Sequence, residues 1–342
     1  MVKSIDVFEH ERLLIGQQGF NQSHWKAFVK LNELHDGAYF DVLHNGLKFK
    51  QYVGVLQVDG LLVQIHPKAD KNDSDESWRN VLLQMLKRCG RIKADHLGDA
   101  YLKKQRVNLL EVYFEMYLKE VEQLLHAGLI KKYRRQTENV PALKGKLEFA
   151  GHIRKNLVHQ ERFYTSHQVY DRDHMLHQVL HCALRIVRDF SGATGLYGRC
   201  QRTLLDFPEV KQILPTASTL NGIRLDRKST PYSRAFELAR LIILHFSPDI
   251  SGGKNNMIAL LFNMNDLWEE FVLKEIQTYV AKNGLNIIVN GQESKAFWGS
   301  RNIRPDIVIH MNGETIVIDT KWKRPYDNRP SIEDVRQMYA YA

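Results

Sequence analysis

Two aspartates near the end of the chain lie where they could share a metal ion and act on a phosphate ester. Asp306 precedes one apolar run, Asp319 follows another, and Asn312-Gly313 lies between the two runs. Asn-Gly between β-branched residues predicts a β-hairpin with a type I′ turn, because both central residues of that turn need positive φ. With these two residues as the loop, Asp306 is expected directly opposite Asp319 on one face of the hairpin.

Two carboxylates placed in this way repel each other. Directly opposed strand residues have Cβ atoms roughly 4.5 to 5.5 Å apart, and like charges at that separation destabilise a sheet. Val308 and Val317 share the aspartate face while isoleucines line the other, so both faces are expected to be buried. A hard divalent cation with oxygen ligands would offset the repulsion. Lys321 falls on the aspartate face because strand side chains alternate, and its ammonium group could stabilise developing negative charge or help to activate a nucleophile.

The spacing of these residues resembles the PD-(D/E)xK nuclease motif. It is present here as Pro305-Asp306, twelve intervening residues, and Asp319-Thr320-Lys321. Upstream, Asn265–Val272 predicts an amphipathic helix, and its Glu269 matches the helix glutamate that completes the metal shell in many such nucleases. The resemblance implies a Mg²⁺ site, with Mn²⁺ as a substitute, whose ligands are Asp306, Asp319, Glu269 and the Thr320 carbonyl.

A second helix is predicted downstream of the hairpin. Ser331–Asp334 has the pattern of a capping box, and the helix that it opens carries Gln337 and Tyr341 at i and i+4, on one face. The pair resembles the QxxxY motif of nucleases related to the RecB family, where it adjoins the active site and supports the DNA or the lysine. The chain stops at Ala342 within this apolar helical pattern, so the final strands and helix of a nuclease core are expected to be missing.

Three further segments narrow the resemblance. Leu143–Ala150, continuing through Ile153-Arg154, resembles a K-G-x-[LI]-E-F-A…I-R element. Tyr170–Asp173 resembles an acidic helix start, and Val63–Lys68 is similar to an I-x-P-K strand end. Together they resemble the McrC family, the nuclease subunits of modification-dependent 5-methylcytosine restriction systems. The resemblance implies a DNA endonuclease subunit whose N-terminal region docks in a hexameric AAA+ GTPase, and it allows for nuclease–nuclease dimerisation in the complex.

The distribution of charge predicts where DNA is attracted. The net charge is +9, and residues 76–160 hold 17 Lys plus Arg against 9 Asp plus Glu, whereas residues 256–342 hold 10 against 11. Attraction for DNA phosphates, which positions a duplex without recognising its sequence, is therefore expected from the middle of the chain. The basic clusters there are Lys87–Lys93, Lys103–Arg106 and Lys131–Arg135.

Other features bear on location and partners. The three cysteines, Cys89, Cys182 and Cys200, are too few for a disulfide framework and indicate the cytoplasm. The sequence contains neither an apolar run of membrane-spanning length nor a signal-peptide core at its start, so no membrane association is expected. It also lacks a phosphate-binding loop, since Gly252-Gly253-Lys254 has neither the spacing nor the following hydroxyl. Nucleotide hydrolysis is therefore expected from a partner.

Hydrophobic periodicity predicts a multidomain α+β protein in three parts. Residues 1–72 are expected to form a β-rich N-terminal domain that docks the partner, a meander with one helix at Ser23–Leu34, followed by a linker at Lys71–Glu76. Residues 73–255 are expected to form a mainly helical, basic middle domain. Residues 256–342 are expected to form the PD-(D/E)xK restriction-endonuclease-like α/β core, in which a helix leads into the hairpin sheet. The helices expected in the middle domain are Trp78–Leu86, Val107–Leu125, Met175–Phe190 and Tyr232–Phe246.

Several residues and the function itself have alternative interpretations. The hairpin aspartates could be solvated at strand ends, with Lys321 pairing one of them, and Glu269 and the basic clusters could be ordinary solvated residues. His174, His177 and His181 lie near one helical face, but no ligands of zinc spacing accompany them, so packing or interhelical hydrogen bonding is preferred. The alternative functions are a noncatalytic adaptor that tethers DNA and activates a ring NTPase, and a self-sufficient RecB-like exonuclease.

Overall fold

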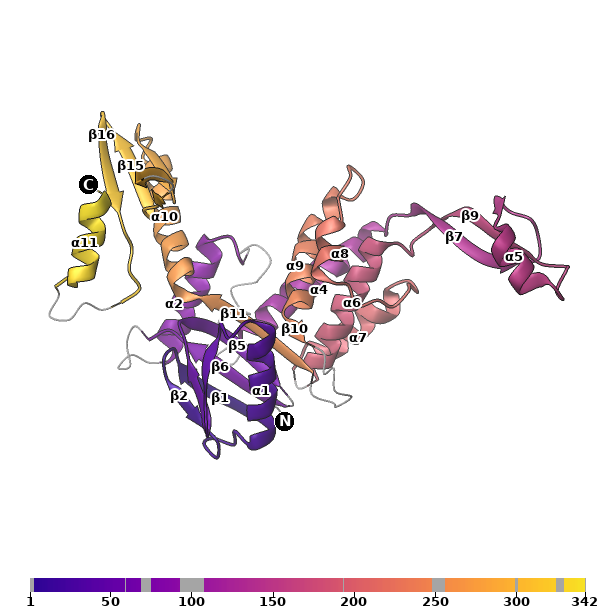
Figure 1. Ribbon diagram of the computed structural model, residues 1–342, viewed down its shortest axis with the longest axis horizontal. Helices are drawn as coiled ribbons and strands as arrows, with labels where there is room; N and C mark the ends of the chain where they lie inside the picture. Colours follow the sequence, from indigo (N-terminus) through magenta and orange to yellow (C-terminus); the bar gives the residue numbers. More distant parts are fainter. Residues whose placement is uncertain are drawn as a thin grey trace. The chain divides into compact units, whose positions relative to one another are not determined.

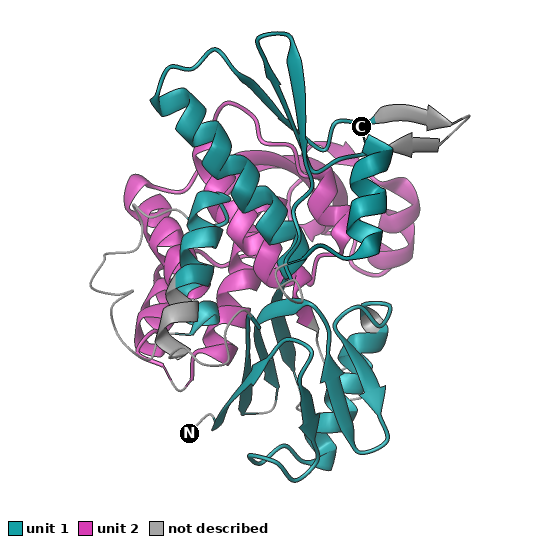
Figure 2. Ribbon diagram, turned by 90° about the vertical axis from the view of Figure 1, so that its left-hand side faces the viewer, with its two compact units in different colours: residues 1–112, 247–342 teal, residues 113–246 magenta. Residues whose placement is uncertain are grey.

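The chain is a mixed α/β protein with several small sheets (Figure 1). The computed structural model describes residues 3–58, 60–68, 75–92, 108–192, 194–247, 256–298, 301–323 and 329–341. Contacts divide the chain into two compact units, unit 1 with residues 1–112 and 247–342, and unit 2 with residues 113–246 (Figure 2). The three expected ranges 1–72, 73–255 and 256–342 stay a prediction, because units defined by contacts need not coincide with segments that fold independently.

The largest sheet of unit 1 combines N-terminal strands with a strand from much later in the chain. Its strand order is β1-β6-β5-β11-β10. β1 runs parallel to β6, whereas β5 pairs antiparallel with both β6 and β11. The expected meander is therefore wrong, because β1 pairs out of sequence order and β11 completes the sheet. The strands are β1 (Lys3–Phe8), β5 (Tyr52–Val58), β6 (Leu61–His66), β11 (Met257–Asn263) and β10 (Phe246–Ser247).

A smaller sheet and one helix cover this N-terminal core. The sheet has the order β2-β4-β3 and consists of β2 (Arg12–Leu14), β3 (Phe40–Leu43) and β4 (Gly46–Phe49). The expected helix forms as α1 (Gln22–Leu34), capped by the Asn21 side chain. Gly54 allows β5 and β11 to approach closely, since a Cβ at this position would clash with the carbonyl oxygen of Leu260. Buried side chains from these elements form one core, which includes Ile5, Phe28, Phe40, Leu56 and Ala259.

The C-terminal part of unit 1 contains the predicted hairpin between two helices. The helix expected to lead into the hairpin forms as α10 (Met264–Lys282), and it begins directly after β11. Two sheets follow, with the orders β12-β15-β16 and β13-β14. α2 (Asp75–Arg88) packs against α10, and residues 71–74 of the expected linker lie outside the described residues. The elements are α10 (Met264–Lys282), β12 (Ile288–Gly291), β13 (Lys295–Trp298), β14 (Arg301–Ile303), β15 (Ile307–Met311), β16 (Glu314–Ile318) and α11 (Ile332–Tyr341).

Unit 2 is mainly helical, as expected, but it also contains a sheet that was not expected. The sheet has the order β7-β9-β8, and α5 packs against β9. The long strand β7 consists mainly of polar residues on both faces, so it lacks the alternation of apolar and polar residues that reveals a strand in a sequence. The expected helix Tyr232–Phe246 is shorter, because Phe246 belongs to β10. The elements are α4 (Leu109–Ala127), whose first residues belong to unit 1, β7 (Lys132–Val140), β8 (Lys146–Leu147), α5 (Phe149–Asn156), β9 (Phe163–Asp171), α6 (Met175–Phe190), α7 (Tyr197–Asp206), α8 (Ala217–Gly222), η2 (Thr230–Tyr232) and α9 (Ser233–Leu244).

The length and hydrophobicity of a helix decide whether it can span a membrane. Among the residues that the structure describes, none of the helices combines the length and the apolar character needed to cross a bilayer.

Candidate active site

The predicted hairpin forms with the predicted register. β15 and β16 pair antiparallel up to Ile307 opposite Ile318, and the loop residues Asn312-Gly313 have φ values of 52° and 85°, as a type I′ turn requires. Asp306 and Asp319 lie one step beyond the last pair, where the ladder ends. The turn thus brings two carboxylates to the same end of the hairpin.

The hairpin is buried on only one of its strands. Ile307 is fully buried and Val308 is 6% exposed, whereas Ile316 on the partner strand is 42% exposed. The expected burial of both faces is therefore wrong for β16. β16 is exposed because it lies at the edge of the sheet. Among the described residues, β15 has a neighbouring strand on each side, whereas β16 pairs with β15 on one side.

Asp306 is bonded to the residue that follows the second aspartate. Its Oδ2 accepts hydrogen bonds from the backbone N–H of Thr320 (N···O 2.6 Å) and from the Thr320 hydroxyl (3.0 Å). Its backbone carbonyl accepts a hydrogen bond from the N–H of Gln292 at 2.9 Å. These bonds hold the Asp306 carboxylate against the segment that carries Asp319 and Lys321.

Asp319 is almost completely buried among the other predicted site residues. Its side chain is 3% exposed, and its Oδ2 lies 2.7 Å from Nζ of Lys321. Its Oδ1 accepts a hydrogen bond from Nε2 of Gln337 at 3.0 Å, and the same nitrogen donates to the Tyr341 hydroxyl at 2.8 Å. The predicted pair on α11 thus joins the aspartate, because its i, i+4 spacing puts both side chains on one helix face.

The predicted capping box fixes the start of α11. The N–H of Asp334 donates to the Ser331 hydroxyl at 3.2 Å, and the Asp334 carboxylate accepts from the N–H of Ser331 at 3.0 Å. Lys323 lies 2.7 Å from the same carboxylate. Hydrogen bonds from Lys323 and then Ser331 lower the pKa of Asp334 to about 2. The helix that carries Gln337 is therefore attached directly to the segment that follows Lys321.

Glu269 reaches the same site from α10. Partial burial raises the pKa of its carboxyl group, and the charge of Asp306 raises it further. Nε2 of Gln292 donates a hydrogen bond to Glu269 at 3.4 Å and opposes this shift. Because Asp306 affects the ionisation of Glu269, the two carboxylates belong to one electrostatic site.

Lys321 remains a cation in this setting. Partial burial alone would lower its pKa, but the hydrogen bond and charge of Asp319, together with the charge of Asp306, outweigh burial and raise the pKa overall. The side chain is 37% exposed, so it can still reach a ligand. A lysine with a raised pKa suits charge stabilisation rather than proton abstraction.

Sequence reasoning missed Gln292. This residue bonds to both Glu269 and Asp306, and the Arg304 side chain donates to its backbone and side-chain oxygens. Its φ of 50° belongs to a tight turn directly after β12. The preceding Asn290-Gly291 is the local signal that marks this turn.

The donor set suits a hard cation in chemistry but is not arranged as a finished metal site. Carboxylates and a carbonyl supply oxygen, the ligand atom that Mg²⁺ prefers. Within the described part of the chain, no three His, Cys, Asp or Glu side chains converge as metal ligands. Protein donors occupy carboxylate oxygens instead, namely those of Thr320 on Asp306 and those of Lys321 and Gln337 on Asp319. A cation would have to replace some of these donors.

Comparison with known proteins places the chain in a family. Residues 47–342 match the family described as McrBC 5-methylcytosine restriction system component. The chain belongs to the McrBC family. No curated protein matches it.

Two solved structures resemble this McrBC family member. A chain of the refined half-complex from the tetradecameric assembly of Thermococcus gammatolerans McrB AAA+ hexamers with bound McrC is 22% identical, with a TM-score of 0.71, and the match covers 99% of this chain and 84% of that one. A chain of the Thermococcus gammatolerans McrBC complex is also 22% identical, with a TM-score of 0.57 and coverage of 80% and 87%. At this identity the similarity shows a shared fold.

The three segments that suggested the McrC family lie at junctions between elements. Val63–Lys68 contains the end of β6, and Tyr170–Asp173 joins β9 to α6. Leu143–Ala150 turns at Gly145, with φ of 64°, and then forms β8 and the start of α5. In this McrBC chain they organise local structure, at positions distant in sequence from the carboxylates.

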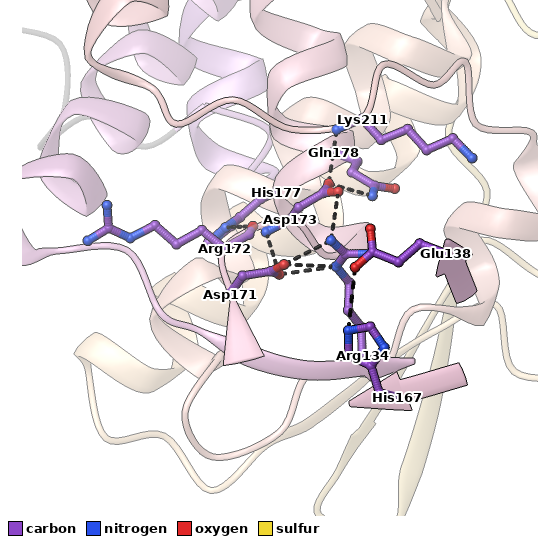
Figure 3. A network of polar contacts seen from close by, with 9 residues as sticks. All are labelled: Arg134, Glu138, His167, Asp171, Arg172, Asp173, His177, Gln178 and Lys211. Atoms are coloured by element: carbon purple, nitrogen blue, oxygen red, sulfur yellow. Dashed lines mark hydrogen bonds and ion pairs between the residues drawn. The ribbon is translucent and has the colours of Figure 1, made fainter. Parts of the chain in front are cut away.

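The histidines of α6 are packing residues. His177 is fully buried, and its Nδ1 lies 2.7 Å from the carbonyl oxygen of Arg172 (Figure 3). His174 Nε2 lies 3.3 Å from the carbonyl oxygen of Ile130, and the two imidazole rings have centroids 3.9 Å apart. Burial and, after it, the charge of His174 lower the pKa of His177 to about 4. Packing, one of the two preferred interpretations, is confirmed for His174 and His177, whereas their hydrogen bonds go to carbonyls outside helices and are not interhelical.

Part of the third basic cluster, Lys131–Arg135, forms ion pairs within unit 2. Arg134 on β7 donates to both carboxylate oxygens of Asp171, from Nε at 3.1 Å and from Nη2 at 2.8 Å, and lies 3.5 Å from Asp173 (Figure 3). Lys132 lies 2.9 Å from Asp226. From strand β7, Arg134 and Lys132 therefore pair with the protein's own acids, an arrangement that the alternative of solvated residues did not predict.

The first basic cluster likewise pairs with carboxylates. Arg88 lies 2.6 Å from Glu275, and Arg91 lies 3.0 Å from Glu270, so both arginines bind α10. Lys93 and the cluster Lys103–Arg106 lie outside the described residues. The phosphate contacts expected from these clusters stay a prediction.

Proposed function

We propose that this chain is the Mg²⁺-dependent DNA endonuclease subunit of a modification-dependent restriction complex, with a nuclease core of the PD-(D/E)xK type. One observation carries the proposal. Six residues chosen for nuclease chemistry, from α10, α11 and the two segments that flank the hairpin, are connected at one end of the hairpin, four by direct contacts and Asp306 and Glu269 through Thr320 and Gln292. They are Glu269, Asp306, Asp319, Lys321, Gln337 and Tyr341.

The residues have distinct roles in the proposed reaction. Asp306, Asp319, Glu269 and the Thr320 carbonyl would hold Mg²⁺, with Mn²⁺ as a substitute. Such an ion, when bound, would supply Lewis-acid chemistry to the scissile phosphate. Lys321, kept protonated by Asp319, would donate a hydrogen bond to the phosphate or the attacking water and stabilise the charge of the pentavalent transition state. Gln337 and Tyr341 orient Asp319 beside the lysine.

The proposed partners follow from the relatives. One of the similar structures contains McrC bound to McrB AAA+ hexamers from a tetradecameric assembly. By analogy, this chain works in the cytoplasm with a hexameric AAA+ GTPase that docks its N-terminal region and delivers DNA, and nuclease subunits meet in the assembly.

The test combines the protein with its substrates and partner. Plasmid with and without 5-methylcytosine is incubated with Mg²⁺ and the chain, in the presence and absence of the AAA+ protein encoded by the neighbouring gene. Cleavage of modified plasmid that requires the chain, the partner and Mg²⁺ is the expected result. Asp319→Ala should abolish cleavage while circular dichroism and DNA binding stay unchanged; cleavage retained by this variant overturns the assignment.

One observation favours the noncatalytic adaptor as the second candidate. Protein donors already bond to Oδ2 of Asp306 and to both oxygens of Asp319, as they would in a hairpin that had lost its metal. Calorimetric titration with Mg²⁺ separates the two functions. An adaptor binds the AAA+ ring without saturable Mg²⁺ binding that depends on Asp319. The third candidate, a RecB-like exonuclease, is recognised by digestion of linear ends without any partner.

A further inference from the structure

The segment that carries Lys321 has no regular backbone structure. Residues 319–323 follow β16 without belonging to a strand or a helix. Side-chain contacts must therefore set the position of the lysine, since no ladder of backbone hydrogen bonds does so. Three such contacts have been described, those of Asp319 with Gln337, Thr320 with Asp306, and Lys323 with Asp334.

Trp322, directly after the lysine, makes a contact of a different kind. Its indole N–H donates to Oε1 of Glu9 at 2.8 Å. Its ring also packs against Trp268, with ring centroids 5.2 Å apart and planes inclined by 54°. Trp268 is the residue before Glu269. The two indoles thus join the sequence neighbours of the proposed catalytic lysine and of the proposed metal ligand on α10.

The N-terminal sheet holds Glu9 in place. Glu9 comes directly after β1, and its N–H donates to the carbonyl oxygen of His66, the last residue of β6, at 2.9 Å. Because β1 and β6 are parallel, their carboxyl ends meet at one edge of the sheet. At this edge the N–H of Lys68 donates to the same Oε1 at 2.7 Å. The carboxylate that binds Trp322 is therefore fixed by two strand ends.

Stability alone does not account for an acid at this position. Glu9 is 2% exposed, and a buried carboxylate is unfavourable unless hydrogen bonds compensate for lost hydration. Oε1 accepts two hydrogen bonds, but Oε2 is buried without one among the described residues, and its neighbour His10 lies 3.9 Å away. An apolar side chain of similar size would avoid this cost. What it could not do is accept the hydrogen bonds from the Lys68 N–H and from Trp322, and only the second of these reaches the segment that carries Lys321.

We propose that Glu9 is a positioning residue for the nuclease site. It anchors Trp322, and through this residue it holds Lys321 beside Asp319 and packs Trp322 against the helix that presents Glu269. The inference rests on the proposed function. It adds that the N-terminal sheet helps to shape the active site without touching DNA or metal.

The experiment measures cleavage of modified plasmid by the full chain with Mg²⁺ and its AAA+ partner. Trp322→Phe removes the N–H and keeps a smaller ring to pack on Trp268, and Glu9→Leu removes the acceptor of the bonds from Trp322 and Lys68. Each should lower kcat by about 10- to 100-fold, the usual cost of losing a residue that orients a metal-site group, while KM for DNA stays unchanged. Glu9→Gln keeps a carbonyl acceptor and should restore most of the rate. The double variant Glu9→Leu/Trp322→Phe should be no slower than the slower single variant, because each single change already removes the bond between Glu9 and Trp322.

A matched control tests whether loss of any tryptophan N–H bond has the same effect. Trp25 donates its indole N–H to the carbonyl oxygen of Gly46 at 3.0 Å, in the N-terminal region and away from the hairpin. Trp25→Phe should keep the full rate, and its melting temperature should match that of Trp322→Phe.

The possible outcomes separate the two proposals. If the wild-type protein cleaves and Trp322→Phe or Glu9→Leu loses rate only in proportion to its folded fraction, the positioning role is wrong and the nuclease assignment stands. If Trp25→Phe is as slow as Trp322→Phe, the effect is structural and the positioning role is again wrong. If the wild-type protein with its partner and Mg²⁺ does not cleave modified plasmid, both proposals fail.

Discussion

The hairpin and the histidine helix both present residue types that bind metals, yet the structure treats them differently. His177 is fully buried, bonds to a backbone carbonyl and packs between aromatic rings. The hairpin residues bond to charged and amide side chains from other elements, and Lys321 is 37% exposed. Metal-binding residue types on one face of a helix or hairpin are thus insufficient to indicate a metal or catalytic site. The informative difference is whether the polar partners are backbone groups of the local fold or side chains brought together from separate elements.

Asp319→Ala should produce the largest effect. It removes a proposed ligand and the partner of Lys321, so cleavage should fall by about 1000-fold, the upper range for loss of one electrostatic group in an active site. Glu314→Ala is the matched control, because Glu314 is an exposed carboxylate on β16, the strand that Asp319 follows. Equal losses in the two variants, measured by plasmid nicking, would place the chemistry elsewhere.

His177 should affect stability and leave cleavage unchanged. Its folded-state pKa of about 4 lies below the ordinary value of 6.5, so the unfolded state binds more protons between these two values. The contribution of neutral His177 to the free energy of unfolding is therefore complete above pH 6.5, and about 3 kcal/mol of it is lost as the pH falls towards 4. Urea unfolding at several pH values should show this loss in the wild-type protein and a flatter profile in His177→Leu. Loss of cleavage in a folded His177→Leu protein at neutral pH would remove the contrast with the hairpin.

Lys321→Met tests the charge of the lysine. Loss of one cation that stabilises transition-state charge should lower kcat by about 100-fold with little change in KM. Lys321→Arg keeps the charge and should recover part of the rate. Lys282→Met, at the exposed end of α10, serves as the control for a loss of one positive charge. A rate lost equally in Lys321→Met and Lys321→Arg would favour a role in proton transfer.

Gln337→Ala should have the smallest effect of the four. It removes the hydrogen bond to Asp319 and leaves the carboxylate paired with Lys321, so a loss of about 10-fold is expected. Arg336→Ala, the neighbouring residue on α11, is the control. Single-turnover cleavage is the appropriate measurement, because it reports the chemical step without product release. An unchanged rate in Gln337→Ala would make the contact with α11 a packing contact.

Local patterns in the sequence predicted much of the site. Asn312-Gly313 fixed the register, and the capping box at Ser331 placed Gln337 and Tyr341 on the correct face. The apolar period of Met175–Phe190 predicted the bounds of α6. In each case the decisive interaction joins residues close in sequence, so the pattern itself contains the information.

Contacts between distant segments were not predictable in this way. The pairing of β11 with β5 depends on which sheet edge is available, and no local pattern of either strand specifies that. β7 gave no apolar period because its alternating residues are polar. The sequence also does not show that Arg134 and Lys132 pair with Asp171 and Asp226, which lie much later in the chain. Gln292 enters the site only through the fold.

The bond between Glu9 and Trp322 also has a consequence for synthesis of the protein. Its two residues are separated by 313 positions, so the chain must be translated as far as Trp322 before the bond can form. Closing so long a loop is entropically unfavourable and comes late in folding. The hairpin can therefore form before its lysine is anchored. If the proposed role of Glu9 holds, full cleavage activity appears only after the two distant segments have met.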